Sequence, residues 1–240
     1  IGGGASGAAA TPDPVDLPGN ELGSGSDYTV FLNFLGVPIV EMSFDGPYGV
    51  YHSMYDNYYW MTRFGDPGFR YMTAMADVWG RMALRLANAE VLPFDFGLYA
   101  SRVDGFAERI AAAAGAGAPS LDAARAAIHR WKAAAATLER RQATLLNEPP
   151  GPDRTRRLRE LNDALRSVEQ QFLLDDGIPG RPWFKHVLYA PRPTYAAMML
   201  PGIQEAIDEG DPGRASAQAA LLAARLNAVA DLLERVSRMR

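Results

Sequence analysis

The chain has 240 residues and no cysteine, and its 24 Lys and Arg against 28 Asp and Glu give a net charge of −4. This balance gives no electrostatic reason to expect a nucleic acid or an anionic membrane as a partner. The absence of cysteine excludes disulfides and thiolate metal ligands, and the length suffices for one large hydrophobic core or two modest ones.

The first residues of the chain are rich in Gly, Ala and Pro and carry few large apolar side chains, which predicts a linker or surface loop over residues 1–20. No charged leader followed by an apolar segment is present, and no run of about 18 apolar residues, so the sequence predicts neither a signal peptide nor a membrane span. Because Ile1 is not an initiator methionine, we expect the natural polypeptide to extend upstream.

A loop of small residues at 23–26 leaves room for a ligand to approach the backbone N–H groups closely. A short helix is expected over residues 28–35, because apolar side chains recur on one face and a glycine follows. Residues 38–44 then alternate between apolar and polar side chains, which predicts a strand. The turn residues that come next place Tyr51 and His52 on a loop, where binding and catalytic groups are often found.

Helical periodicity dominates the remainder of the chain. Apolar residues at spacings of three and four predict a long helix after Asp66, and we interpret its face of Met, Trp and Leu side chains as a core face. A boundary is expected near Asp95, followed by amphipathic helices over about 96–114, 120–146, 158–172 and 222–236. Short polar breaks between helices favour an antiparallel bundle. The aromatic residues of the irregular segment 175–201 are expected to fasten it to the bundle or to a neighbouring domain.

Motifs along nearly the whole chain resemble, in order, the family of co-catalytic zinc peptidases that includes glutamate carboxypeptidase and transferrin receptor. They are LGSGSD (22–27), YHSMYD (51–56), FGDPGF (64–69), NAEVLPFD (88–95), GIPGRPWFKHVLYAP (177–191) and TYAAMMLPGI (194–203). The resemblance implies a mainly α chain, with 1–95 as the C-terminal α/β portion of a zinc exopeptidase domain and 96–240 as a helical dimerisation domain. It also implies a homodimer through the C-terminal helices, and it suggests an extracytoplasmic parent that is secreted, periplasmic or membrane-anchored.

His52 and Tyr51 are the candidate metal ligand and catalytic residue. A single histidine is by itself more often structural than a ligand, but YHS is where the family places a zinc-binding histidine. Tyr51 matches a tyrosine whose hydroxyl donates to the tetrahedral intermediate, although a loop tyrosine with no such role is an equally good interpretation of the residue alone. Catalytic zinc takes about three protein ligands, so the resemblance implies two zinc ions completed by upstream residues. The implied reaction is peptide hydrolysis by a metal-activated hydroxide with an upstream glutamate as base, and this chain alone is predicted to be inactive.

Ser24, Gly25, Ser26 and Tyr195 are the candidate substrate-binding residues. The first three match a family loop that lines the substrate cleft mainly through its backbone, and Tyr195 matches a tyrosine that holds substrate carboxylates. Thr194 stands where the family has a lysine, and Ser26 stands where the mammalian enzyme has an asparagine. The resemblance therefore implies a peptide substrate, but the missing lysine charge removes the reason to expect strict specificity for glutamate.

Two functions of different classes follow from these residues. The first is an exopeptidase of the glutamate carboxypeptidase type, of which this chain is the C-terminal portion. The second is a non-catalytic relative that, like transferrin receptor, keeps the architecture for dimerisation and binding. The presence of His52 favours the peptidase, because a relative without metal has no chemical reason to keep a histidine there. The upstream zinc ligands would discriminate between the two.

Overall fold

The computed structural model describes residues 21–23, 25–44 and 46–239, and they form a mainly α-helical chain, as predicted. The predicted linker over 1–20 and the predicted site residue Ser24 lie outside the described residues. The helices are α1 (Tyr58–Trp60), α2 (Arg70–Ala87), α3 (Phe96–Ala114), α4 (Asp122–Leu146), α5 (Pro152–Arg166), α6 (Pro201–Asp208) and α7 (Pro212–Ser237). Shorter helical turns are η1 (Val30–Phe34), η2 (Met61–Gly65), η3 (Gly115–Gly117) and η4 (Glu169–Phe172), and the strands are β1 (Tyr189–Pro191) and β2 (Ala197–Met199).

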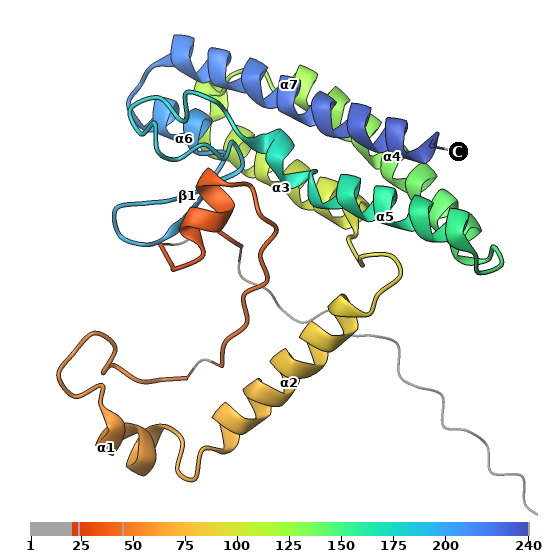
Figure 1. The fold of residues 1–240 in the computed structure, drawn as a ribbon. Coiled ribbons are helices and arrows are strands. Elements are labelled where there is room, and N and C mark those ends of the chain that lie inside the picture. Colours follow the sequence, from red (N-terminus) through yellow and green to blue (C-terminus); the bar gives the residue numbers. More distant parts are fainter. Residues whose placement is uncertain (1–20, 24, 45, 240) are drawn as a thin grey trace, which may run out of the picture.

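The helical bundle consists of α3, α4, α5 and α7, with the short helix α6 packed against α7 (Figure 1). The two longest helices, α4 and α7, lie side by side, and each buries apolar residues at spacings of three and four. Ile128 and Trp131 of α4 and Leu226 and Val229 of α7 are almost completely buried. The apolar stripes seen in the sequence are therefore the core of the bundle, which is the main hydrophobic core of the described residues.

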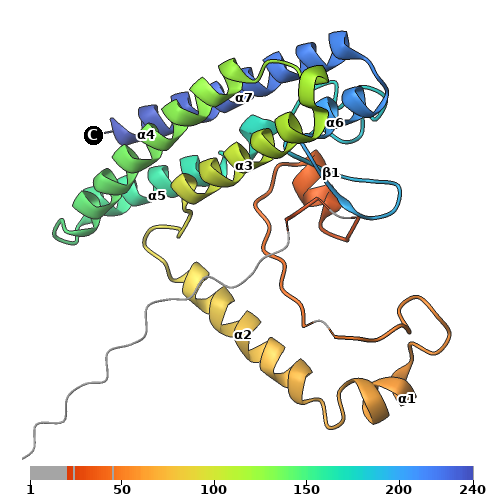
Figure 2. The same ribbon diagram turned by 180° about the vertical axis from the view of Figure 1, so that it is seen from behind.

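The portion before the bundle is much less compact than predicted. Residues 38–44 are extended but form no strand, because no neighbouring strand pairs with them among the described residues. Helix α2 forms where it was predicted, yet none of its residues is buried: Met72 is 53% exposed and Trp79 is 36% exposed. Figures 1 and 2 show that α2 runs away from the bundle. The predicted core face of α2 therefore exists as an apolar face but is not covered by the described residues.

The segment that joins α2 to α3 is fixed to the bundle by two polar side chains of α5. Arg154 donates to both carboxylate oxygens of Glu90, at 2.6 and 3.1 Å, and its Nε donates to the carbonyl oxygen of Leu145 at 3.0 Å. Asn162 accepts from the backbone N–H of Leu92 at 2.9 Å and donates to the carbonyl oxygen of Glu90 at 2.9 Å. The hydrogen bonds from Arg154 also lower the pKa of Glu90. The connection from α2 therefore enters the bundle at a well-defined position.

Candidate functional site

The centre of the candidate site is the hairpin formed by β1 and β2. The strands are antiparallel, with Tyr189 opposite Met199 and Pro191 opposite Ala197. The turn between them is closed by the N–H of Arg192, which donates to the carbonyl oxygen of Ala196 at 2.7 Å. Tyr195 lies at the tip with a φ of 66°, a left-handed conformation that is uncommon for a residue other than glycine. Its side chain is 65% exposed, so the hairpin presents the tyrosine to its surroundings.

The loop of small residues near the start of the described chain lies directly against this tyrosine. The N–H of Gly25 donates to the carbonyl oxygen of Tyr195 at 3.0 Å. A Cβ atom added at Gly25 would lie 2.5 Å from Cδ1 of the Tyr195 ring, so any other residue there would force the ring out of its present position. Ser26 is exposed beside Gly25, but its backbone N–H and carbonyl oxygen are both hydrogen-bonded to the Thr29 hydroxyl. The structure therefore brings the predicted residues Gly25, Ser26 and Tyr195 together, with their backbone groups largely engaged within the chain.

A buried asparagine holds the loop and the hairpin in register. The side chain of Asn33 in η1 donates through Nδ2 to the backbone carbonyl oxygen of Tyr189 at 2.5 Å. The backbone carbonyl oxygen of Asn33 accepts from the N–H of Lys185 at 2.8 Å. The helix can turn back after this contact because Gly36 adopts a φ of 62°. Both ribbon views show η1 beside the hairpin (Figures 1 and 2). The 25–26 loop is thus positioned by the short helix that follows it.

A buried polar network fixes the base of the hairpin to the bundle. The N–H of Leu188 donates to Nδ1 of His186 at 3.2 Å, which assigns the ring proton to Nε2, and Nε2 lies 2.9 Å from Oε1 of Glu169. The Tyr99 hydroxyl donates to the same carboxylate oxygen at 2.9 Å. Burial, together with the Glu169 charge, raises the pKa of Tyr99. The sequence indicated His186 only as one of several aromatic groups that attach this segment, and no local pattern identifies Glu169 as its partner.

The predicted catalytic residues lie elsewhere. Tyr51 is 68% exposed, His52 is exposed with a φ of 57°, and their rings contact each other at 3.9 Å between centroids. Their loop precedes α1 and lies apart from the hairpin in both ribbon views (Figures 1 and 2). Within the described residues, no group of three or more His, Cys, Asp or Glu side chains could hold a metal ion. The described residues therefore do not fit a complete zinc site, and the structure does not bring Tyr51 and His52 to Tyr195.

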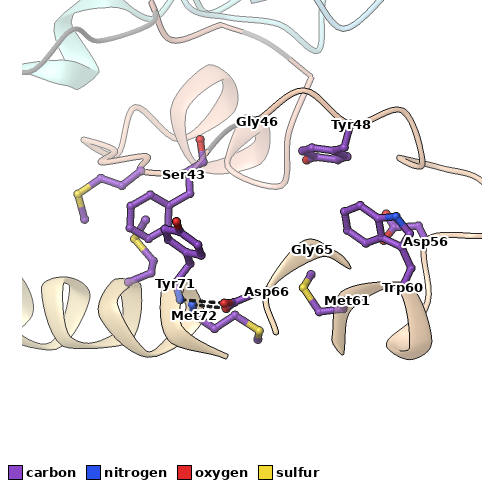
Figure 3. A pocket seen from close by; sticks show the side chains of 13 residues that line it. Ser43, Gly46, Tyr48, Asp56, Trp60, Met61, Gly65, Asp66, Tyr71 and Met72 are labelled. Atoms are coloured by element: carbon purple, nitrogen blue, oxygen red, sulfur yellow. Dashed lines mark hydrogen bonds between the residues drawn. The ribbon is translucent and has the colours of Figure 1, made fainter. Parts of the chain in front are cut away.

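A hollow of about 660 Å³ is lined by the segment 42–48, by α1 and η2, and by the start of α2. Methionine and aromatic side chains line most of it, as Figure 3 shows. At its edge the Asp66 carboxylate accepts hydrogen bonds from the N–H groups of Tyr71 and Met72, at 3.1 and 2.9 Å. Although burial opposes ionisation of Asp66, these donors outweigh it and lower the pKa of the carboxyl. Asp66 thus stabilises the first turn of α2, and its role here is structural.

The helical bundle around the site defines a known class of domain. Residues 119–234, which include α4 to α6 and most of α7, match the transferrin receptor-like dimerisation domain. The chain belongs to the family of proteins that carry this domain. Within the described residues, no helix has both the length and the apolar character required to cross a membrane.

Individual relatives extend the similarity to the portion before this domain. The chain is 37% identical over 188 residues to the probable glutamate carboxypeptidase LAMP1 of Arabidopsis thaliana, which covers 78% of this chain and 27% of that protein. It is 31% identical to the aminopeptidase NAALADL1 of Rattus norvegicus, over 77% of this chain and 26% of the relative. It is 27% identical to the inactive zinc metalloprotease C354.09c of Schizosaccharomyces pombe, over 78% of this chain and 25% of that protein. The chain spans about a quarter of the length of these relatives.

Proposed function

We propose that this chain is the C-terminal portion of a metallo-exopeptidase that resembles glutamate carboxypeptidase and hydrolyses peptide bonds. The contact between Gly25 and Tyr195 carries the proposal, because it joins two segments predicted to line one substrate cleft. The names of the relatives support a peptidase parent. In this proposal the parent binds two zinc ions, His52 supplies one ligand, and upstream residues supply the others.

The proposed role of Tyr195 is to hold a substrate carboxylate through its exposed hydroxyl. Its backbone is fixed on both sides, by the hairpin turn and by Gly25, so little conformational freedom is lost when substrate binds. The Gly25 and Ser26 loop contributes the shape of the cleft, because its backbone groups are already hydrogen-bonded. Thr194 adds no charge, so this chain alone offers no strong preference for a glutamate side chain at that position.

Tyr51 is proposed to donate a hydrogen bond from its hydroxyl to the oxyanion of the tetrahedral intermediate. This role requires its loop to approach the Tyr195 hairpin more closely than it does here. The apolar residues exposed on α2, among them Met72 and Trp79, are proposed to pack against the upstream part of the same polypeptide. That packing would position α2 and the loop before it, which explains why the catalytic and substrate-binding residues are separated in this chain.

The test compares the chain with the complete protein. We expect the complete protein to release the C-terminal residue from short peptides in a chelator-sensitive reaction. We expect the chain of residues 1–240 to be inactive and to bind zinc weakly, because only one of the implied ligands is present. Mass spectrometry of the peptide products and calorimetric zinc titration measure the two properties. Tight stoichiometric zinc binding by the chain alone, or no hydrolysis by the complete protein, would contradict the proposal.

The alternative is a non-catalytic dimerisation and binding module like transferrin receptor. One observation favours it: a relative that matches over most of this chain is named an inactive zinc metalloprotease. The upstream sequence discriminates, because replacement of two or more implied zinc ligands by apolar residues would remove the basis for metal chemistry. In either case we propose an extracytoplasmic location for the parent, and we expect no nucleic acid partner for a chain with a net charge of −4.

The second part of the proposal is a homodimer formed through the C-terminal helices. Helix α7 exposes an apolar stripe at spacings of three and four, which consists of Ala217, Ala220, Leu221 and Ala224. Leu221 is 39% exposed, and the small neighbours allow a second helix to approach closely.

We expect Leu221→Arg to shift the protein from dimer to monomer in light scattering at micromolar concentration, because an unpaired charge in a helix contact costs several kcal/mol. The matched control is Leu146→Arg at the end of α4, where the leucine is 42% exposed. An equal effect of both variants, or a monomeric wild-type protein, would contradict this assignment.

A further inference from the structure

A partly buried arginine connects the hairpin to helix α6. Nη1 of Arg181 donates to the carbonyl oxygen of Pro191, the last residue of β1, at 2.6 Å. Nη2 of the same group forms an ion pair with Oε1 of Glu205 in α6 at 2.6 Å. The side chains of Arg181 and Glu205 are only 24% and 19% exposed. One guanidinium therefore ties the end of β1 to α6, the short helix that packs against the bundle.

The loop around Arg181 is built to hold its side chain in this direction. Gly177 has a φ of 71°, and a Cβ atom added there would collide with the carbonyl group of Pro182. The N–H of Arg181 donates to the carbonyl oxygen of Ile178 at 2.9 Å. The carbonyl oxygen of Arg181 accepts from the N–H of Phe184 at 3.0 Å. The guanidinium also lies over the Phe184 ring, 4.8 Å from its centroid. Backbone and ring contacts thus restrict the guanidinium to one position.

This position matters for the tyrosine at the tip of the hairpin. Pro191 is the residue immediately before the turn, and the turn contains Tyr195, whose N–H donates to the carbonyl oxygen of Arg192 at 3.0 Å. Beyond its short-range hydrogen bonds, the turn is held by the hydrogen bond from Gly25 and by Arg192, whose Nη1 donates to Oδ2 of Asp208 in α6 at 3.4 Å. Because Arg192 directly follows Pro191, a shift of the Pro191 carbonyl group is passed to the start of the turn that carries the tyrosine.

We propose that Arg181 is a positioning residue for substrate binding: by holding the Pro191 carbonyl group against α6, it fixes the Tyr195 turn and so sets the affinity for the substrate carboxylate. The inference rests on the proposed function, in which Tyr195 contacts substrate. Arg181 does not touch the reacting atoms. Burial raises the pKa of Glu205, and the charges of Arg181 and Arg214 oppose this shift.

The first experiment is steady-state kinetics on the complete protein. Arg181→Met is expected to raise KM roughly tenfold or more with little change in kcat, because a charge-assisted hydrogen bond to the hairpin is lost while the reacting groups stay in place. The KM of Arg181→Lys is expected to lie between those of the wild type and Arg181→Met, since an ammonium group can reach the Pro191 carbonyl oxygen or the Glu205 carboxylate but not both. The matched control is Arg156→Met, because Arg156 is an exposed arginine of α5 that pairs with Asp153 and Glu160.

The second experiment does not depend on activity. Hydrogen exchange of the chain should become faster across residues 189–199 in Arg181→Met and stay unchanged in α4, whereas Arg156→Met should leave both regions as in the wild type. If Arg181→Met matches the control in KM and in exchange, the proposal is overturned. A Tyr195→Phe variant separates the two hypotheses: an unchanged KM there would overturn the substrate role of Tyr195, whereas faster hairpin exchange in Arg181→Met would still support its role in fixing the turn.

Discussion

Replacing Trp131 by alanine should lower the free energy of unfolding by about 3–5 kcal/mol. The indole ring is completely buried in α4. It contacts the Tyr99 ring edge-on, with 5.3 Å between centroids, and the Phe172 ring at 5.7 Å. These partners belong to α3 and η4, so the ring joins three elements of the bundle. Its removal loses the transfer free energy of a large apolar group and leaves a cavity that the surrounding helices can only partly close.

The matched variant is Trp131→Phe, for which we expect a clearly smaller loss. A phenyl ring keeps part of the aromatic contacts, and the Trp131 indole N–H has no hydrogen-bond acceptor in the part of the chain that the structure describes. Urea denaturation followed by circular dichroism measures both variants, and an unchanged m value shows that stability has changed rather than compactness. A loss below about 1 kcal/mol for Trp131→Ala would show that the ring does not join these elements in solution.

Replacing His52 by alanine in the complete protein should remove most of the peptidase activity and leave the free energy of unfolding almost unchanged. The ring is exposed and makes its only described ring contact with Tyr51, so the substitution opens no cavity. The expected loss of activity follows from the proposed role as a zinc ligand, because removal of one ligand weakens metal binding and changes the coordination geometry.

The matched control for this prediction is His129→Ala, the same chemical change at an exposed position of α4. We expect His129→Ala to keep normal kcat/KM and normal zinc content, while His52→Ala loses both. Metal analysis of the purified variants separates a lost ligand from a lost contact with substrate. Normal turnover with normal zinc content in His52→Ala would rule out the proposed role of this residue.

The bundle could be predicted from sequence because its helices carry their own signal. The spacing of Ile128, Trp131 and Leu138 predicted one buried face of α4, and all three are almost completely buried. The spacing of apolar residues likewise predicted helices in the regions of α3 and α7. A helix whose apolar stripe is covered by neighbouring helices of the same chain obeys the periodicity rule, since its partner surfaces are also encoded in the chain.

The portion before Asp95 shows the limit of that rule. The stripe that contains Met72 and Trp79 predicted a helix correctly, but periodicity identifies an apolar face without identifying what covers it. The alternation over 38–44 likewise indicates a segment suited to a sheet, while a strand forms only beside another strand. Both failures therefore concern missing partner surfaces rather than wrong local preferences.

The candidate site was predictable only in part. The resemblance pointed to Gly25 and Tyr195, and the structure adds that a Cβ atom at Gly25 would displace the Tyr195 ring from its present position. The left-handed backbone of Tyr195 and the contact of Arg181 with Pro191 depend on how the hairpin turn and the loop before it fold against each other. No local pattern of residue types encodes such contacts, so the positioning residues could not be found before the fold was known.

The hydrogen bond between Gly25 and Tyr195 has a consequence for engineering the protein. In the proposed function, one part of the substrate cleft belongs to the segment before the bundle, and the adjoining part belongs to a hairpin inside the dimerisation domain. A truncated enzyme that ended near Asp95 would keep the histidine loop but lack the part that carries the tyrosine. If the proposed function holds, exchanging the helical half with that of a relative is expected to alter which peptides are accepted, in addition to how the subunits assemble.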